Sequence, residues 1–231
     1  MAGSRVALFR SLTIDNYFMI RRASAALLAM TVCTASHANP QDTNRENFTA
    51  AVNTFLAQRG HLCVAKYTWP IYVLDSDKGH TNDAVQMPVL ERLGLVTGKD
   101  MTVQGTDKGK KVIAHARQYQ LTQEGKKYYL HIPEVVATAT QRVTHPADLC
   151  VATLTLDQVV GWEKPVQRNG GLMTSVVYTY KIDPAPWTKD PDFQRAFPMV
   201  TRVVEGAGTL QLREGMHLTK TGWVAEEIFQ R

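Results

Sequence analysis

The chain has 231 residues, of which 44% are hydrophobic and 20% are charged, and its formal net charge is +5 at pH 7. Four arginines and one aspartate lie within the first 38 residues, which leaves 22 basic and 20 acidic side chains in the rest. This composition is that of a globular protein. The near balance of charge excludes the strong positive field of a protein that binds nucleic acid or membranes through charge alone.

Residues 19–38 have the pattern of an export signal. Two arginines precede an apolar run over 25–32, and small residues at 36 and 38 occupy the −3 and −1 positions of a cleavage site. The run is shorter than the roughly 20 residues that a membrane-spanning helix needs. We therefore expect cleavage near Ala38, a periplasmic or secreted product, and no transmembrane segment in the mature chain.

The start of the leader and its single cysteine each leave an alternative. Residues 1–18 fit no signal peptide, so we expect translation to begin at Met19. Cys33 offers the alternative of a lipoprotein, although the preceding Met30-Thr31-Val32 lacks the small residues of a lipidation motif.

Two cysteines follow the leader, Cys63 and Cys150. An even number of cysteines in an oxidising compartment favours a disulfide. The alternative is a pair of buried free thiols.

The first predicted element is an amphipathic helix that begins at the capping box Thr43–Glu46 and ends at Gly60. Its apolar side chains recur with helical spacing at Phe48, Val52, Phe55 and Leu56. The next run, 61–75, is rich in β-branched and aromatic residues and predicts a strand. Pro70 interrupts this run, so the strand should be bent or lie at a sheet edge.

A second helix is predicted over 84–96, with its proline near the first turn, where a missing N–H costs least. A loop rich in glycine and lysine, 97–111, then leads to a strand over 112–121. Thr122 is the predicted N-cap of a short helix over 123–130.

After a spacer over 132–147, strands predominate. We expect strands over 149–162 and 171–182, and Asn169-Gly170 is a strong hairpin-turn signal between them. Alternation along the second strand gives one face to Leu172, Thr174, Val176, Tyr178 and Tyr180. The remainder, from 183 onward, combines a proline-stopped loop and a short helix with one or two final strands and a terminal turn.

Two short segments recur in the same order along the chain. Leu62-Cys63-Val64-Ala65 matches Leu149-Cys150-Val151-Ala152, and Leu121-Thr122-x-x-Gly125 matches Leu218-Thr219-x-x-Gly222. A duplicated unit would bring the equivalent strands side by side and make the two cysteines natural disulfide partners. The alternative is that these short matches are coincidental.

Residues 84–130 contain L-x-x-L-G-L-V, a loop, a strand with Arg117-x-Tyr119, and then L-T-x-x-G-K-x-Y. In this pattern the segment resembles a winged-helix domain. The resemblance implies that the helix ending at the L-G-L segment is the DNA recognition helix and that the following hairpin is the wing.

The loop of this unit holds the candidate contacts to an anionic partner, Lys108, Lys110 and Lys111, with Asp100 and Asp107 among them. The predicted recognition helix is negatively charged overall. Since DNA recognition requires clustered cations together with side chains that reach base edges, we do not expect nucleic acid as a partner.

Enzyme motifs are absent from the sequence. It contains no G-x-S-x-G, H-E-x-x-H or C-x-x-C, and the GTDKGK segment at 105–110 departs from a P-loop. His61 would share a strand face with Cys63, which leaves thiol activation or metal ligation as an alternative. The histidines show no metal-ligand spacing. We predict no catalytic residue, no cofactor and no metal.

The pattern LC…WP…MP.L..LGL…Y.LT..G..Y is similar to a group of uncharacterised exported proteobacterial proteins, a resemblance that implies no activity. The predicted fold is α+β, with helices, antiparallel strands, a winged-helix-like unit and a C-terminal half rich in β-hairpins. The predicted segments are the leader (1–38), the winged-helix-like unit with its helix (39–135) and a strand-rich unit (148–231).

The leading hypothesis is a soluble, non-enzymatic binding or interaction protein of the bacterial envelope, with an unknown envelope protein or ligand as its partner. The alternatives are a winged-helix nucleic-acid-binding protein and an envelope enzyme with a dispersed site.

Overall fold

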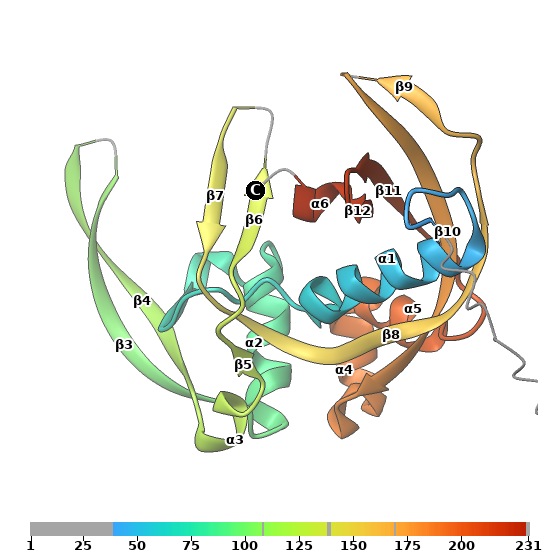
Figure 1. Cartoon of the computed structure of the whole chain (residues 1–231). Coiled ribbons are helices and arrows are strands. Elements are labelled where there is room, and N and C mark those ends of the chain that lie inside the picture. Colours follow the sequence, from blue (N-terminus) through green and yellow to red (C-terminus); the bar gives the residue numbers. More distant parts are fainter. Residues whose placement is uncertain (1–38, 108, 138–139, 169, 230–231) are drawn as a thin grey trace, which may run out of the picture. The chain divides into compact units, whose positions relative to one another are not determined.

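The computed structural model describes residues 39–107, 109–137, 140–168 and 170–229, so the predicted leader lies outside the described residues. The described part is an α+β fold of helices and antiparallel strands, as predicted (Figure 1). None of its helices combines the length and the apolar character needed to cross a bilayer.

The described helices differ widely in length. They are α1 (Arg45–Arg59), α2 (Asn82–Arg92), α3 (Gln123–Lys126), α4 (Pro191–Ala196), α5 (Pro198–Glu205) and α6 (Glu226–Phe229), with 3₁₀ turns η1 (Asp75–Asp77) and η2 (Pro186–Lys189). The strands are β1 (His61–Cys63), β2 (Ile71–Leu74), β3 (Val96–Asp107), β4 (Lys110–Leu121), β5 (Tyr129–Leu130), β6 (Glu134–Ala137), β7 (Arg142–His145), β8 (Asp148–Trp162), β9 (Val166–Arg168), β10 (Gly171–Pro184), β11 (Leu212–Thr219) and β12 (Gly222–Ala225).

The strands form three sheets. The seven-stranded sheet has the order β1-β8-β10-β11-β12, with β5 paired to β8 and β9 paired to β10. A three-stranded sheet has the order β2-β4-β3, and β6 and β7 form a separate hairpin. Helix α1 packs on the large sheet against β8 and β12, and α2 contacts both the small sheet and α4.

The first predicted helix is confirmed, but its N-cap and the strand after it differ from the prediction. The cap is Asn44, whose side chain accepts a hydrogen bond from the backbone N–H of Asn47 at 2.8 Å, and not the threonine before it. The stretch 61–75 is not a single strand, although each of its two strands lies at the edge of a sheet, as expected. It is divided into β1 in the large sheet and β2 in the small one. The extended backbone is interrupted at Ala65, where φ is +59°.

The second helix is shifted toward the N-terminus relative to the prediction. Because α2 begins after the Thr81 cap, Pro88 lies inside the helix rather than in its first turn. The helix stops before Gly94, whose φ of +75° suits a residue without a side chain.

The predicted glycine- and lysine-rich loop over 97–111 is wrong, since most of it is strand β3. This strand pairs with β4 without interruption from Val96↔Leu121 to Asp107↔Lys110. The backbone ladder holds the hairpin even where both faces are exposed, so the strand needs few apolar side chains to form.

Thr122 is the N-cap of α3, as predicted, and accepts a hydrogen bond from the N–H of Gly125 at 3.0 Å. The helix is four residues long, shorter than predicted, because Tyr129 already pairs with β8. A Cβ at Gly125 would lie 1.9 Å from the carbonyl oxygen of Leu95. The two halves of the winged-helix-like motif are thus in backbone contact, and this contact requires glycine.

The second copy of the Leu-Thr-x-x-Gly segment has a different structure. Thr219 is the last residue of β11, and Gly222, with a φ of +122°, begins β12 rather than a helix. A duplicated winged-helix unit is therefore not confirmed. The first repeated segment does behave as predicted, because β1 lies beside β8 with Cys63 opposite Cys150.

The C-terminal strands are largely as predicted. β8 and β10 lie where the sequence indicates, whereas β9 was not predicted; Gly170, with a φ of +79°, lies in the turn between β9 and β10. The predicted face of β10 is the buried one for Thr174, Val176, Tyr178 and Tyr180. The β6–β7 hairpin was not predicted, because β7 is mostly exposed and lacks apolar alternation.

Two apolar clusters form the core. One joins α2 and the small sheet to α4 and α5, with Met87, Leu90, Tyr119, Phe193 and Phe197 among its members. The other packs α1 on the large sheet, with Phe48, Val52, Tyr180, Met216 and Trp223 among its members. Both predicted segments, 39–135 and 148–231, contribute to both clusters, and β8 runs through both.

Candidate functional site

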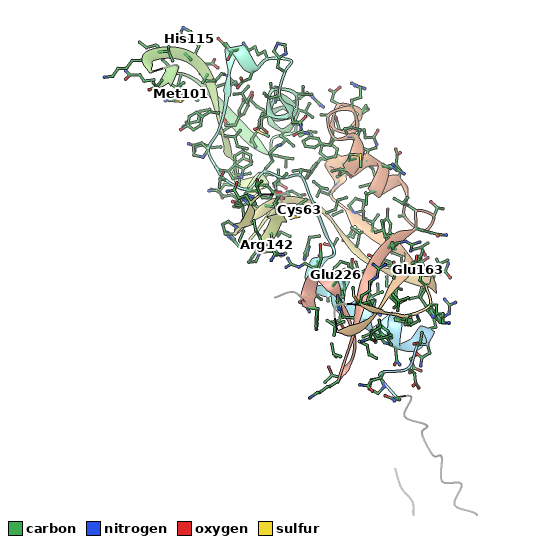
Figure 2. All side chains as sticks on the ribbon, turned by 90° about the horizontal axis from the view of Figure 1, so that it is seen from above. Cys63, Met101, His115, Arg142, Glu163 and Glu226 are labelled. Atoms are coloured by element: carbon green, nitrogen blue, oxygen red, sulfur yellow. A yellow bond between two sulfur atoms is a disulfide. The ribbon has the colours of Figure 1, made fainter. Side chains whose placement is uncertain are left out.

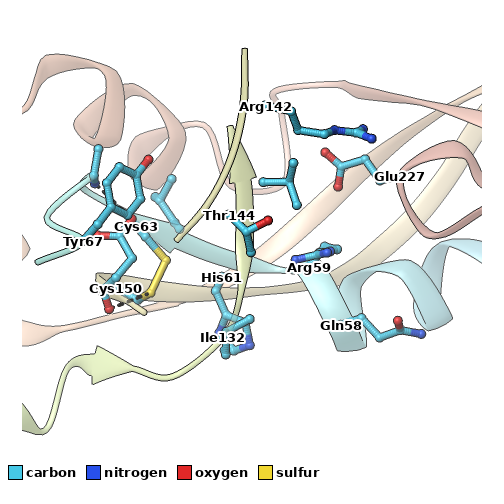
Figure 3. A pocket seen from close by; sticks show the side chains of 14 residues that line it. Gln58, Arg59, His61, Cys63, Tyr67, Ile132, Arg142, Thr144, Cys150 and Glu227 are labelled. Carbon is cyan, nitrogen blue, oxygen red and sulfur yellow. Dashed lines mark hydrogen bonds between the residues drawn. A yellow bond between two sulfur atoms is a disulfide. The ribbon is translucent and has the colours of Figure 1, made fainter. Parts of the chain in front are cut away.

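A cavity of about 790 Å³ lies among the end of α1, β1, the β6–β7 hairpin and α6 (Figures 2 and 3). We call it the disulfide cavity. It is lined by Gln58, Arg59, His61, Leu62, Cys63, Ala65, Tyr67, Ile132, Val135, Arg142, Thr144, Asp148, Cys150 and Glu227. Its walls therefore come from three separate stretches of the chain, 58–67, 132–150 and the C-terminal Glu227.

The Cys63–Cys150 disulfide forms part of the cavity wall and confirms the predicted pairing. The two cysteines are cross-strand neighbours in β1 and β8 and are 87 residues apart in sequence. His61 lines the same cavity, as its position in the strand predicted. Because Cys63 is bonded to Cys150, it offers no thiol for His61 to activate.

His61 is neutral at neutral pH, because partial burial lowers the pKa of its imidazole. Its Nδ1 atom is buried and has no hydrogen-bond partner among the described residues. The imidazole thus adds no charge to the cavity.

Asp148 is a buried carboxylate in the wall of the cavity, with 3% of its surface exposed. Its side chain accepts hydrogen bonds from the backbone N–H groups of Ala65 at 3.1 Å, Lys66 at 2.7 Å and Leu149 at 2.7 Å. Burial raises the pKa of Asp148, and the three N–H groups oppose that rise. The carboxylate fixes the turn after β1 and thereby the shape of the cavity.

The other end of the cavity carries the charged side chains. Figure 3 shows Arg59, Arg142 and Glu227 on the side away from the disulfide and Tyr67. Arg59 donates one hydrogen bond to the carbonyl of Pro133 at 2.7 Å. Arg142 is exposed, and within the described part of the chain it has no ion-pair or hydrogen-bond partner.

The β6–β7 hairpin is held against the cavity by ring stacking. Tyr67 and His145 stack with centroids 3.7 Å apart and an interplanar angle of 12°. The hydroxyl of Tyr129 donates a hydrogen bond to the carbonyl oxygen of Tyr67 and so holds the backbone that carries the Tyr67 ring. Through this stack the hairpin places Arg142 and Thr144 on the cavity wall.

A group of glutamates lies beside Glu227. Burial, together with the charges of Glu227 and Glu226, raises the pKa of Glu214 to about 7. No cluster of three or more possible metal ligands occurs in the part of the chain that the structure describes.

The predicted lysine contacts are not part of the cavity. Lys108 lies outside the described residues, and so does the side chain of Lys110, whose backbone belongs to β4. Lys111 is exposed near the end of the β3–β4 hairpin. Figure 2 shows this hairpin, marked by Met101 and His115, extending away from the labelled cavity residues.

Helix α2, the predicted recognition helix, contacts α4. Arg92 pairs with Asp190 at 2.5 Å and Asp192 at 2.9 Å. The side-chain amide of Gln86 donates to the carbonyl of Ala196 at 3.1 Å. Gln86 and Arg92, two side chains on this helix of the types that can read bases, are thus engaged within the protein.

Sequence reasoning found the disulfide and His61 but missed the arginines and the glutamate of the cavity. No spacing in the sequence connects Arg59, Arg142 and Glu227, since they lie on elements distant along the chain. The β6–β7 hairpin, a segment whose sequence pattern predicts only a spacer, brings them together. No protein-family model matches this chain, and neither does a curated protein or a solved structure.

Proposed function

We propose that this protein is an exported, non-enzymatic binding protein of the bacterial envelope whose ligand occupies the disulfide cavity. The observation that carries the proposal is the cavity itself. Its volume of about 790 Å³ is within the range of sites for small organic molecules. Its wall combines apolar side chains, among them Leu62, Ile132 and Val135, with polar and charged groups that could orient a ligand.

Export is supported by two independent features. The pattern of residues 19–38 is that of a cleaved signal, and the Cys63–Cys150 disulfide suits an oxidising compartment. The resemblance to exported proteobacterial proteins points the same way.

The competing functions have less support from the geometry. A nucleic-acid-binding role would use α2, which contacts α4 and whose Arg92 is paired with two aspartates. A thiol enzyme would need Cys63 free, and it is bonded. We infer that the winged-helix-like unit serves to pack the fold, and that the close contact of Gly125 with the backbone of Leu95 holds its two halves together.

Expression of the full chain in a bacterium with a periplasm tests the proposal. The product should be found in the periplasmic fraction, begin after Ala38, and have a denatured mass 2 Da below that of the dithiol. Native mass spectrometry should show an additional, non-covalent mass that is lost on denaturation. An uncleaved cytoplasmic product would contradict export, and a ligand-free product that takes up no small molecule would contradict the binding role.

A further inference from the structure

We infer that the disulfide cavity selects an amphiphilic organic anion, whose charged group contacts Arg59 and Arg142 and whose apolar body lies along the disulfide end. This inference rests on the proposed function and names its ligand class. The observations behind it are the separation of charged and apolar groups within one cavity and the balance of charge at its polar end.

The polar end has a net positive charge. Arg59 and Arg142 line it together with a single carboxylate, that of Glu227. Arg142 has no partner within the described part of the chain, so its guanidinium can pair with an incoming anion without breaking an existing contact. Arginine is suited to this role because it remains charged and presents several N–H donors in one plane.

The other titratable groups of the wall do not reverse this charge. His61 is neutral because burial lowers its pKa. Asp148 is buried, and three backbone N–H groups already hydrogen-bond its carboxylate. An anion at the arginine end therefore meets one competing charge, Glu227.

The apolar end offers a surface for a hydrophobic body. The disulfide and the ring of Tyr67 supply this surface, and Leu62, Ile132 and Val135 add apolar side chains elsewhere in the lining. In Figure 3 the disulfide and Tyr67 lie opposite the charged side chains, with Thr144 between them. Burial of an apolar body here would favour binding, and the arginines would select for the anionic group.

Two dyes with the same skeleton test the inference directly. 1-Anilinonaphthalene-8-sulfonate carries a sulfonate that N-phenyl-1-naphthylamine lacks. Fluorescence titration of the mature protein should show binding of the anionic dye at least about tenfold tighter than that of the neutral one, which corresponds to one charge-assisted contact. Arg142→Gln and Arg59→Gln should each weaken the anionic dye about tenfold and leave the neutral dye unchanged.

The control variants distinguish selection for the anionic group from nonspecific binding of the dyes. Arg168→Gln removes an exposed arginine on β9, outside the cavity, and should change neither affinity. Glu227→Gln removes the competing charge and should tighten the anionic dye by about threefold. Thermal unfolding of each variant should match that of the unmodified protein.

Two results would overturn the inference. If both dyes bind equally and the arginine variants behave like the control, the cavity binds ligands without selecting anions, and the proposed function survives alone. If neither dye binds, the cavity is not a ligand site and both the inference and the binding proposal fail.

Discussion

Replacing both Cys63 and Cys150 with alanine is expected to lower the free energy of unfolding by about 4 kcal/mol. The disulfide closes a loop with a sequence separation of 87, and a crosslink over such a distance strongly restricts the unfolded chain. The loss is a large fraction of the roughly 5–15 kcal/mol that stabilises a typical domain. Urea unfolding monitored by tryptophan fluorescence measures it.

Reduction of the unmodified protein provides the control. The reduced protein should unfold at the same urea concentration as the double alanine variant. In both, the free energy of unfolding should fall more steeply with urea than in the disulfide-bonded protein, because the unfolded chain without the crosslink exposes more surface. If reduction leaves the midpoint unchanged, the bond does not constrain the unfolded state and this account of its role is wrong.

Asp148→Ala is expected to destabilise the protein by about 4 kcal/mol, because three backbone N–H groups would lose their acceptor. Each buried donor left without a partner costs about 1–3 kcal/mol. The turn after β1 should then loosen, and the binding of the anionic dye should weaken with it. Urea unfolding and the dye titration measure the two effects.

Asp148→Asn is the matched variant, since it keeps the shape and one acceptor oxygen, and it should cost about half as much. Burial raises the pKa of Asp148 in the folded state, so the stability that the protonated group contributes is lost as pH rises through that pKa. The asparagine variant does not titrate there. The loss of unfolding free energy in this variant, relative to the unmodified protein, should therefore be larger near pH 4 than at pH 7. The opposite trend would contradict a raised pKa of Asp148.

Local signals in the sequence were reliable where a single side chain decides the backbone. Thr122 caps α3, and Gly60 closes α1 through its N–H to Leu56 at 2.8 Å. The apolar face of β10 is also the buried one. Each of these features depends on residues within a few positions of one another.

The misread strands are those whose pairing decides the structure. Strand β3 looks like a loop by composition and is held by its ladder to β4. The run over 61–75 looks like one strand, but β1 pairs with β8 and β2 with β4. Pairing partners far along the chain cannot be read from local propensity.

The candidate site was half predictable for the same reason. The disulfide could be foreseen because exported proteins tend to pair their cysteines. The charged end could not, because Arg59 and Arg142 meet only through the β6–β7 hairpin, which the stack of Tyr67 on His145 holds.

Amide hydrogen exchange with and without the anionic dye tests the central claim most directly, because it shows where a ligand binds. We expect the dye to slow exchange in β1, β7 and α6, whose residues line the disulfide cavity. A second hollow of about 600 Å³, lined in part by Trp69, Tyr129 and His131, offers the main competing location. Slowed exchange around Trp69 with none in β1 or β7 would contradict the assignment of the disulfide cavity as the binding site.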